Sequence, residues 1–373
     1  MGLFAKISNR VLFIINIIVV AVFLFACLNW YFNPQHLPLV SLLGLAFPFL
    51  LLLVMFFMVW WIFVKRKWAL LSAIAIILGG REIVHFFAFN FNSGFVEIKN
   101  QNDIRIATWN VARFIEQRKN NNPGSQARYK MLQQIKKTDA DILCLQEFAS
   151  SPNADWYNNI IAIGRGLNYP FYYFPHFKDG NPLNSGNVIF SRFPIIDSGT
   201  VRFPRPTLPE ALVFVDIKRG GKMIRIYTTH LQSNQFKKED ISKIEELKGG
   251  KSFWGNFPHI FSKLSFAIRQ RSVQADMVND IMKNSPYPVV FTGDLNDVPN
   301  SYTYHQVRGK LNDAFLKKGF GIGRTFSSIS PTLRIDYFFY DNNFRLQQYK
   351  RVLSNYSDHY MLVSDFELIQ EAK

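Results

Sequence analysis

The feature that most constrains this chain is a block of 54 consecutive residues, 11–64, that contains no Asp, Glu, Lys or Arg. Lys6 and Arg10 precede the block, and the basic triplet 65–67 follows it. A helix needs about 20 apolar residues to cross the hydrocarbon core of a bilayer. The block is therefore long enough for two spans, and it excludes an ordinary water-soluble fold for the N-terminal part of the chain.

Two prolines within residues 33–38 break the block once, because proline disrupts a helix interior. We expect membrane-spanning helices over about residues 11–30 and 39–64. A third apolar stretch, about 68–89, is interrupted by charged residues at 81–82 and predicts either a third span or a helix lying in the membrane interface. No small-residue cleavage site follows the first stretch, so we expect a retained anchor rather than a signal peptide.

The basic residues predict how the anchor is oriented, because Lys and Arg are retained on the cytoplasmic side of a membrane. Lys6 and Arg10 place the N-terminus inside, and residues 65–67 place the end of the second span inside as well. Two spans would leave the rest of the chain in the cytoplasm, whereas three would put it outside. We expect three spans, since Arg81 can extend to the far headgroups. The expectation is thus a multi-pass protein of a bacterial inner membrane with a periplasmic or otherwise extracytoplasmic C-terminal domain.

The composition after about residue 91 is that of a globular protein. We expect a membrane anchor over residues 1–91, a linker over 92–102 and one large domain over 103–373, which is long enough for a single core. Residues 92–373 carry about +11 of the chain's net charge of +16. A basic surface indicates an anionic partner, which could be nucleic acid, phospholipid headgroups or a phosphate ester.

Short apolar runs that end in polar residues predict the strands of this domain. Helical periodicity occurs at about 127–137 and 259–283, whereas residues 203–243 contain strands with no helix between them. This irregular alternation favours an α/β (α+β) domain with mixed or antiparallel sheets over a doubly wound parallel sheet. The predicted strands cover residues 104–109, 142–146, 187–190, 211–217, 223–228, 288–292, 335–340 and 361–366.

Polar residues follow several of these strands at the point where each strand ends. Asn110, Glu147, His230 and Asp294 are such residues. Active sites are commonly built where strand ends converge. Taken singly, each residue is equally well explained by a turn, a solvated strand end or a structural histidine. As a set, and together with His359, they supply the oxygen ligands, amide donors and imidazoles that phosphoryl chemistry requires.

Seven short motifs contain these residues. In chain order they are Ala107-Thr108-Trp109-Asn110, Leu145-Gln146-Glu147, Ser185-Gly186-Asn187, Thr229-His230-Leu231-Gln232, Gly293-Asp294-Leu295-Asn296-Asp297, Arg334-Ile335-Asp336-Tyr337 and Ser357-Asp358-His359-Tyr360. In this order, over about residues 104–366, the chain resembles the endonuclease/exonuclease/phosphatase superfamily. The resemblance implies a four-layer α/β sandwich, two mixed β-sheets flanked by helices. It also implies hydrolysis of a phosphate ester by in-line attack of water.

The resemblance implies a divalent metal held by Glu147 with help from Asn110 and Asp358. Mg²⁺ is the expected ion, with Mn²⁺ or Ca²⁺ as alternatives, because such hard cations take oxygen ligands and Mg²⁺ keeps several waters. The first motif departs from the abasic-site endonuclease branch, where a carboxylate stands at the position of Ala112. This departure argues against DNA repair and makes the motif more similar to sphingomyelinase-like and pancreatic deoxyribonuclease-like members.

The remaining roles that the resemblance implies concern proton transfer. Asp336 would hold His359 in one tautomer, so that the imidazole takes a proton from the attacking water. Asp294 would orient the nucleophile or share in the proton transfer. His230 and Asn296 complete the expected catalytic set.

Side-chain donors are also expected to bind the non-bridging oxygens of the phosphate as charge builds on them. The resemblance implies that this phosphate-binding set comprises Asn110, Asn187, His230 and Asn296.

The anchor and the motifs together suggest a membrane-anchored phosphodiesterase that acts on a phospholipid or a sphingolipid-like ester, with the lipid bilayer as partner. Tethering favours a lipid substrate because it raises the local concentration. The alternative is a membrane-tethered endonuclease or exonuclease acting on DNA or RNA. A catalytically inactive binding or scaffold protein is less favoured, because a degenerate site would have lost at least one motif residue.

Residues 236–262 combine lysines with Phe and Trp, which fits either a solvated loop and helix or an insertion that touches lipid headgroups. Arg269 and Arg271 follow on the predicted helix and are expected to be surface charges. His305 is expected to be a helix residue rather than a ligand.

Overall fold

The architecture rests on two six-stranded mixed sheets. The computed structural model describes residues 3–91, 94–115, 126–175, 183–204, 211–236, 239–240, 242–243 and 253–369. The first sheet has the order β13-β14-β2-β3-β5-β4, in which β2 and β3 are parallel and the other neighbours antiparallel. Its strands are β2 (Ile104–Asn110), β3 (Ile142–Ser150), β4 (Phe171–Tyr173), β5 (Asn184–Ser191), β13 (Phe344–Val352) and β14 (Met361–Leu368).

The second sheet has the order β10-β12-β9-β8-β7-β6, and β8 and β9 form its parallel pair. The strands are β6 (Ile195–Arg202), β7 (Ala211–Arg219), β8 (Lys222–His230), β9 (Val289–Asp294), β10 (Asn312–Asp313) and β12 (Asp336–Tyr340). Each sheet thus has one parallel pair in its interior, and in each pair the carboxyl ends of both strands meet at one edge.

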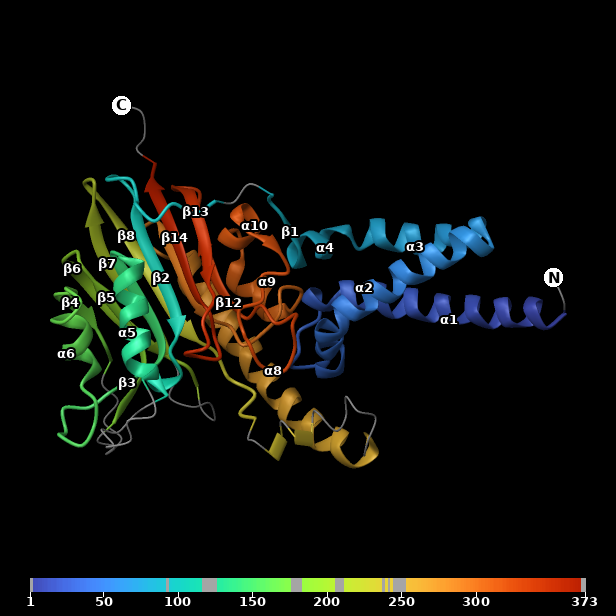
Figure 1. Ribbon diagram of the computed structural model, residues 1–373, viewed down its shortest axis with the longest axis horizontal. Helices are drawn as coiled ribbons and strands as arrows, with labels where there is room; N and C mark the ends of the chain where they lie inside the picture. Colours follow the sequence, from blue (N-terminus) through green and yellow to red (C-terminus); the bar gives the residue numbers. More distant parts are fainter. Residues whose placement is uncertain are drawn as a thin grey trace.

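Side chains alternate between the two faces of each strand and so divide the core into layers. In β2, Ile104 and Ile106 join the core between the sheets, whereas Ala107 and Trp109 face the outer layer. The outer face of the first sheet is covered by α5 (Ala127–Thr138) and α6 (Asn159–Gly164). The outer face of the second is covered by α8 (Phe253–Lys283) and α9 (Tyr302–Arg308) (Figure 1). This arrangement confirms the predicted four-layer sandwich.

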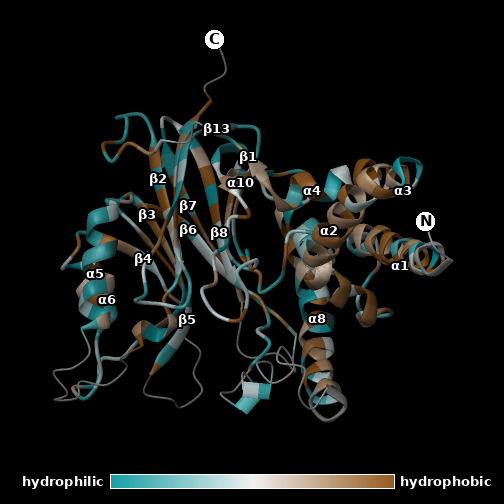
Figure 2. Cartoon of the chain, turned by 45° about the vertical axis from the view of Figure 1, so that its right-hand side comes forward, coloured by the Kyte–Doolittle hydropathy of each residue, from teal (hydrophilic) through white to brown (hydrophobic). Residues whose placement is uncertain are grey.

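Two apolar helices, α1 (Leu3–Cys27) and α2 (Pro38–Val64), are long enough to cross a membrane. The next two, α3 (Arg66–Leu78) and α4 (Gly80–Phe86), form a pair bent by 60°, which allows a third span. These helices project from one side of the sandwich (Figure 1), and hydrophobic residues cover much of α1 to α3 (Figure 2). The α2–α3 junction at Lys65 lies at the tip remote from the sheets.

The third apolar stretch ends earlier than its sequence suggests. Residues of β1 (Ala88–Phe89) pair with β11 (Phe320–Gly321), so the end of the expected 68–89 span belongs to the globular domain. Ala88 is buried in the core that also contains Phe315. The short α10 (Ala314–Lys318) and the 3-10 turns Asn29–Tyr31 and Ala112–Phe114 complete the elements of the described chain.

One buried ion pair ties the first sheet together and generates a prediction. Arg105 on β2 binds Asp365 on β14 through two hydrogen bonds, Nε–Oδ1 at 2.7 Å and Nη2–Oδ2 at 2.8 Å, and both side chains are almost fully buried. Asp365→Ala leaves a buried guanidinium unpaired, so we expect the free energy of unfolding to fall by about 3–5 kcal/mol. Chemical denaturation of the full chain in detergent measures the change.

The matched control for that measurement is Glu367→Ala on the same strand. Glu367 pairs with Arg345 at 3.1 Å, but both side chains are exposed. We expect a loss of about 0–1 kcal/mol, as for exposed ion pairs. Equal losses for the two variants would contradict the assigned role of the buried pair.

Candidate active site

The two parallel strand pairs bring four of the sequence-predicted residues to one edge of the sandwich. Asn110 ends β2, and Glu147 lies in the adjacent β3. His230 ends β8 and is paired in register with Asp294, which ends β9. Because the two sheets pack face to face, the carboxyl ends of both pairs converge.

Asp294 stands at the centre of this convergence, and its side chain is almost completely buried. Its Oδ2 accepts a hydrogen bond from Asn110 Nδ2 at 3.0 Å, and its Oδ1 accepts one from the backbone N–H of Asn296 at 2.8 Å. The Nε2 atoms of His230 and His359 lie 3.6 Å and 3.7 Å from Asp294 Oδ2. One buried carboxylate therefore connects residues of both sheets.

His359 and Asp336 form a buried pair. His359 Nδ1 lies 3.1 Å and 3.0 Å from the two carboxylate oxygens of Asp336, so the ring donates from Nδ1 and Nε2 is left on the side of Asp294. Burial by itself disfavours the charged ring, but the carboxylates of Asp336 and Asp294 outweigh it and raise the pKa of His359 to about 10. The pair therefore holds its proton on the imidazole at neutral pH.

Glu147 is more accessible than Asp294, with a side chain 35% exposed. The pairing of β3 with β5 shifts in register between Leu145 and Phe148, and Glu147 adopts a positive φ of 47° inside this bulge. A bulge of this kind re-aims a side chain at the end of a strand. Glu147 Oε1 accepts a hydrogen bond from Asn110 at 3.3 Å and lies 3.7 Å from His230 Nε2.

The site opens into a cavity of about 290 Å³ whose lining is partly polar and partly apolar. The polar lining includes residues that the sequence singled out: Glu147, His230, Asp294, Asn296, Asp358 and His359. The apolar lining includes Leu45, Leu264, Ile268, Phe326, Ile329 and Leu333, and the ring of Phe326 lies 4.9 Å from the ring of His359.

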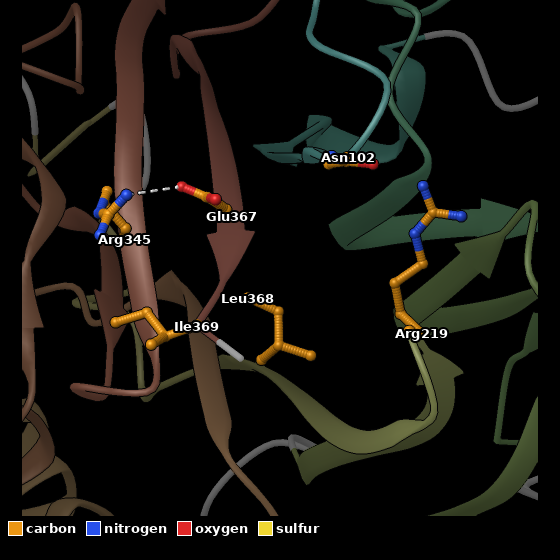
Figure 3. Close-up of a pocket in the computed structure, with 7 residues that line it drawn as sticks. Asn102, Arg219, Arg345, Glu367, Leu368 and Ile369 are labelled. Atoms are coloured by element: carbon orange, nitrogen blue, oxygen red, sulfur yellow. Dashed lines mark hydrogen bonds and ion pairs between the residues drawn. The ribbon is translucent and has the colours of Figure 1, made fainter. Parts of the chain in front are cut away.

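Another cavity, of about 560 Å³, lies beside Asn102, Arg219 and Arg345 at the end of the sandwich where the C-terminal strand finishes (Figure 3). None of the predicted site residues lines it, so we place the site at the smaller cavity.

Two predicted residues have a different placement. The Nδ2 of Asn187 donates to the backbone oxygen of Ala211 at 2.9 Å, so this amide is engaged with the backbone in the described structure. The Nδ2 of Asn296 similarly donates to Leu231 O at 3.0 Å, although Asn296 does line the cavity. The Asn187 amide thus joins β5 to the start of β7, and the Asn296 amide joins its own loop to the residue that follows β8.

The expectation that Arg271 is a surface charge is wrong. Arg271 is 2% exposed, lines the cavity from α8, and donates to Gln232 O at 2.9 Å and Asn234 Oδ1 at 3.0 Å. The burial of Arg271 was hard to predict from the sequence, because polar and apolar residues are mixed along this helix and do not show which face is buried. Arg269 is exposed as expected, and His305 lies in α9.

Sequence reasoning also missed Gln146, which is fully buried beneath the site. Its Nε2 donates to Thr108 Oγ1 at 2.9 Å in the first sheet and to Thr228 Oγ1 at 2.8 Å in the second. A buried polar residue directly before Glu147 was the available signal. Of residues 236–262, positions 237–238, 241 and 244–252 lie outside the described structure, so the proposed lipid-touching insertion is not described by it.

Comparison with known proteins decides the family. A profile of the Endonuclease/Exonuclease/phosphatase family matches residues 107–359, which is more than half of the chain. The chain belongs to this family. Its members are metal-dependent phosphodiesterases and nucleases that hydrolyse phosphate esters, so the protein is a hydrolase of phosphate ester bonds. A second profile, a domain of unknown function (DUF8431), matches residues 9–86, the apolar helical region.

Solved structures of the endonuclease/exonuclease/phosphatase fold are similar to this chain. The human Nocturnin catalytic domain with bound sulfate shares 20% identity over 75% of this chain and 98% of its own, with a TM-score of 0.49. A family protein from Beutenbergia cavernae shares 18% identity over 72% of each chain, with a TM-score of 0.48. One from Bacteroides thetaiotaomicron shares 18% over 73% of this chain and all of its own, with a TM-score of 0.47. No curated protein sequence matches the chain.

Gly293 allows the two catalytic strands of this family member to lie side by side. Its φ is +147°, and a Cβ there would lie 2.2 Å from the backbone oxygen of Thr229. Gly293→Ala must push β9 away from β8 and displace Asp294 and His230, so we expect a loss of about 3 kcal/mol or more in unfolding free energy together with loss of activity. Chemical denaturation and ester hydrolysis measure the two effects.

Gly221→Ala provides the control, because Gly221 also has a positive φ, +82°, but its Cβ would meet open space. Backbone strain alone predicts a cost of about 1 kcal/mol and normal turnover. If the two alanine variants behaved alike, strain rather than the close approach to Thr229 would explain the requirement for glycine.

Proposed function

We propose that this protein is a membrane-anchored, divalent-metal-dependent phosphodiesterase that hydrolyses a phospholipid or a sphingolipid-like ester. The observation that carries the proposal is the mixed lining of the cavity, in which acids and imidazoles lie together with apolar side chains. A lipid has the same division, since its phosphate is polar and its chains are apolar.

The donor set around Glu147 fits a hard cation. Glu147 and Asp358 both line the cavity, and carboxylates and amides supply the oxygen ligands that Mg²⁺ prefers. We therefore assign the metal to Glu147 and Asp358. As observed, Asn110 Oδ1 accepts from the backbone N–H of Ala112 at 3.1 Å, and its Nδ2 donates to Glu147 at 3.3 Å, so Asn110 supports the ligand Glu147. Mn²⁺ or Ca²⁺ would be accommodated by the same donor types.

A second group of possible ligands, Asp294, Asp336 and His359, has its ligand atoms within 4.8 Å of one another. These atoms already bind one another or Asn110, because Asp336 is paired with His359 Nδ1 and Asp294 accepts from the amide. We assign this group to proton transfer instead.

The chain's own residues account for the hydrolytic step. A bound divalent cation would offset negative charge on the phosphoryl oxygens and lower the pKa of nearby acids. Asp336 fixes the ring of His359. With its pKa lowered by the positive charge of the bound cation, the neutral ring would take a proton from water through Nε2 as the water oxygen forms its bond to phosphorus. The ester P–O bond breaks, and the leaving oxygen gains a proton, giving an alcohol and a phosphomonoester. His230 and Asn296 donate to the phosphoryl oxygens.

The composition of the cavity favours a lipid over a nucleic acid. A protein that binds the phosphate backbone of nucleic acids does so with several Lys or Arg side chains. Among the described residues that line this cavity, Arg271 is the basic residue of that kind, and it lies within 3.4 Å of Asp297. The charge of about +11 on residues 92–373 is therefore not concentrated at the described part of the site.

The geometry of the helices supports the proposed topology of the anchor. The start of α1, with Lys6 and Arg10, and the α2–α3 junction, with residues 65–67, lie toward the tip remote from the sheets (Figure 1). Positive residues are retained on the cytoplasmic side. We propose three spans, the third made by α3 and α4, with the globular domain on the outer face of a bacterial inner membrane.

We expect the purified full chain to release phosphate-containing headgroups from mixed vesicles of phosphatidylcholine, phosphatidylethanolamine, phosphatidylglycerol and sphingomyelin in the presence of Mg²⁺. His359→Ala removes the assigned base and should lower this rate by at least about 10²-fold, and EDTA should abolish it. Headgroup release is followed by mass spectrometry, with labelled DNA and RNA offered in parallel.

The control variant is His259→Ala. His259 is an exposed residue of α8, and its Nε2 lies 2.9 Å from Asp240 Oδ1. It should retain wild-type turnover. Metal-dependent cleavage of DNA or RNA without any lipid turnover would replace the proposal with the tethered nuclease. Normal turnover in His359→Ala would remove the catalytic assignment.

Alkaline phosphatase fusions test the topology, because that reporter is active only outside the cytoplasm. A fusion after residue 92 should be active, because three spans precede it and place it outside the cytoplasm. A fusion after residue 65 should be inactive, because two spans precede it and return the chain to the cytoplasm. An inactive reporter at residue 92 would mean two spans and a cytoplasmic domain.

A further inference from the structure

The membrane anchor contributes directly to the wall of the catalytic cavity. Leu45 lies on α2, one of the two helices long enough to span a membrane, yet it lines the same cavity as Glu147 and His359. Two further apolar residues of the lining, Leu264 and Ile268, come from α8. A tether that merely held the domain near the membrane would not reach the site.

Specific contacts hold α2 in this position. A Cβ on Gly44 would lie 2.4 Å from Asn29 Nδ2, so glycine permits α2 to pack closely on the preceding turn. The same Nδ2 donates to the backbone oxygen of Asn300 at 3.2 Å, four residues after the site residue Asn296. Asn29 and Asn300 are both almost fully buried. The residue next to Gly44 is Leu45, which is thereby held against the cavity.

A second set of contacts joins the anchor to α8. The side chain of Gln35 donates to Arg269 O and to Ser272 Oγ, each at 3.4 Å, and Asn33 Nδ2 donates to Tyr302 Oη at 3.3 Å. α2 also packs against α8 directly. The two apolar contributions to the wall therefore come from elements in mutual contact.

The apolar wall continues along α2 away from the sheets. Phe49, Leu52 and Phe56 follow Leu45 at intervals of four, seven and eleven residues, which places all four on one face of the helix. Phe49 is 51%, Leu52 62% and Phe56 58% exposed. In a membrane, this face would extend from the cavity into the region of the lipid chains.

We infer that Leu45 is a specificity-determining residue that selects substrates with a long apolar chain, which lies along the Leu45–Phe49–Leu52 face of α2. The inference rests on the proposed lipid phosphodiesterase function and assigns part of its substrate site to the anchor. It further implies that the substrate enters sideways from the bilayer, with the phosphate reaching the acids last.

The test compares lipid and soluble substrates in the full chain reconstituted in detergent micelles. Leu45→Trp places a bulky indole ring where the leucine side chain lines the cavity. We compare the rate of headgroup release from the four-lipid mixture with the rate of bis(p-nitrophenyl) phosphate hydrolysis, and we expect the ratio of the first rate to the second to fall at least about tenfold. Leu45→Ala removes the contact without adding bulk and should reduce the preference for dioleoyl over dihexanoyl phosphatidylcholine. The two variants act in opposite directions on volume, so a folding defect in one leaves the other informative.

Leu39→Trp is the matched control, because Leu39 is 63% exposed in the first turn of the same helix and is not among the described residues that line the cavity. It should keep the wild-type ratio. A wild-type chain that turns over lipid while Leu45→Trp and Leu39→Trp show the same ratio would overturn the inference and leave the proposed function standing. A wild-type chain that cleaves the soluble ester but no lipid would overturn both.

Discussion

The site depends on a carboxylate that would be too costly to bury without partners. Asp294 lies at the seam between the two sheets and receives hydrogen bonds from Asn110 of the first sheet and from the Asn296 backbone of its own loop. An isolated buried charge is strongly unfavourable, whereas a hydrogen-bonded one is tolerated. His359 and Asp336 join the sheets in the same way a few ångströms away. The proposed catalytic groups therefore also join the two sheets at this edge of the sandwich.

The interior strands and the residues at their ends could be read from the sequence, whereas the edge strands could not. The strands that end the two sheets are β4, β6, β10 and β13, and none of them was predicted. Edge strands are half exposed and alternate irregularly; β13 buries Phe344, Leu346 and Tyr349 but leaves polar residues between them. Without a continuous apolar run, only the pairing partner reveals such a strand.

Part of the site could be predicted from local sequence, whereas the rest depends on contacts between residues that are distant in the chain. Asn110, Glu147 and Asp294 follow apolar runs directly, so local sequence places them at one edge. The inward orientation of Arg271 and the backbone bond of Asn187 depend on neighbours that are distant in the chain, and no local pattern records those. The contact between the anchor and the globular domain could not be predicted from local sequence either, because the hydrogen-bonded residues Asn29 and Asn300 are 271 residues apart.

The contact between the anchor and the sheets extends beyond the cavity wall. On α4, Glu82 lies 3.3 Å from His305 Nε2 of α9. The backbone oxygen of His85, also on α4, accepts from Arg334 at 2.8 Å, two residues before Asp336. Arg308 donates to His85 Nε2 at 3.1 Å, which requires a lone pair on that nitrogen, so hydrogen bonds also join α4 to α9.

The cavity is lined by residues from two parts of the chain, the globular domain and the anchor helix α2. Strand register in the sheets fixes the acids and imidazoles within the matched family region, whereas Leu45 joins the same lining from α2, which lies outside that region. On the proposed function, an anchor helix of different sequence would change the Leu45 part of the lining, and with it the choice of substrate, without changing the strands that hold the polar groups.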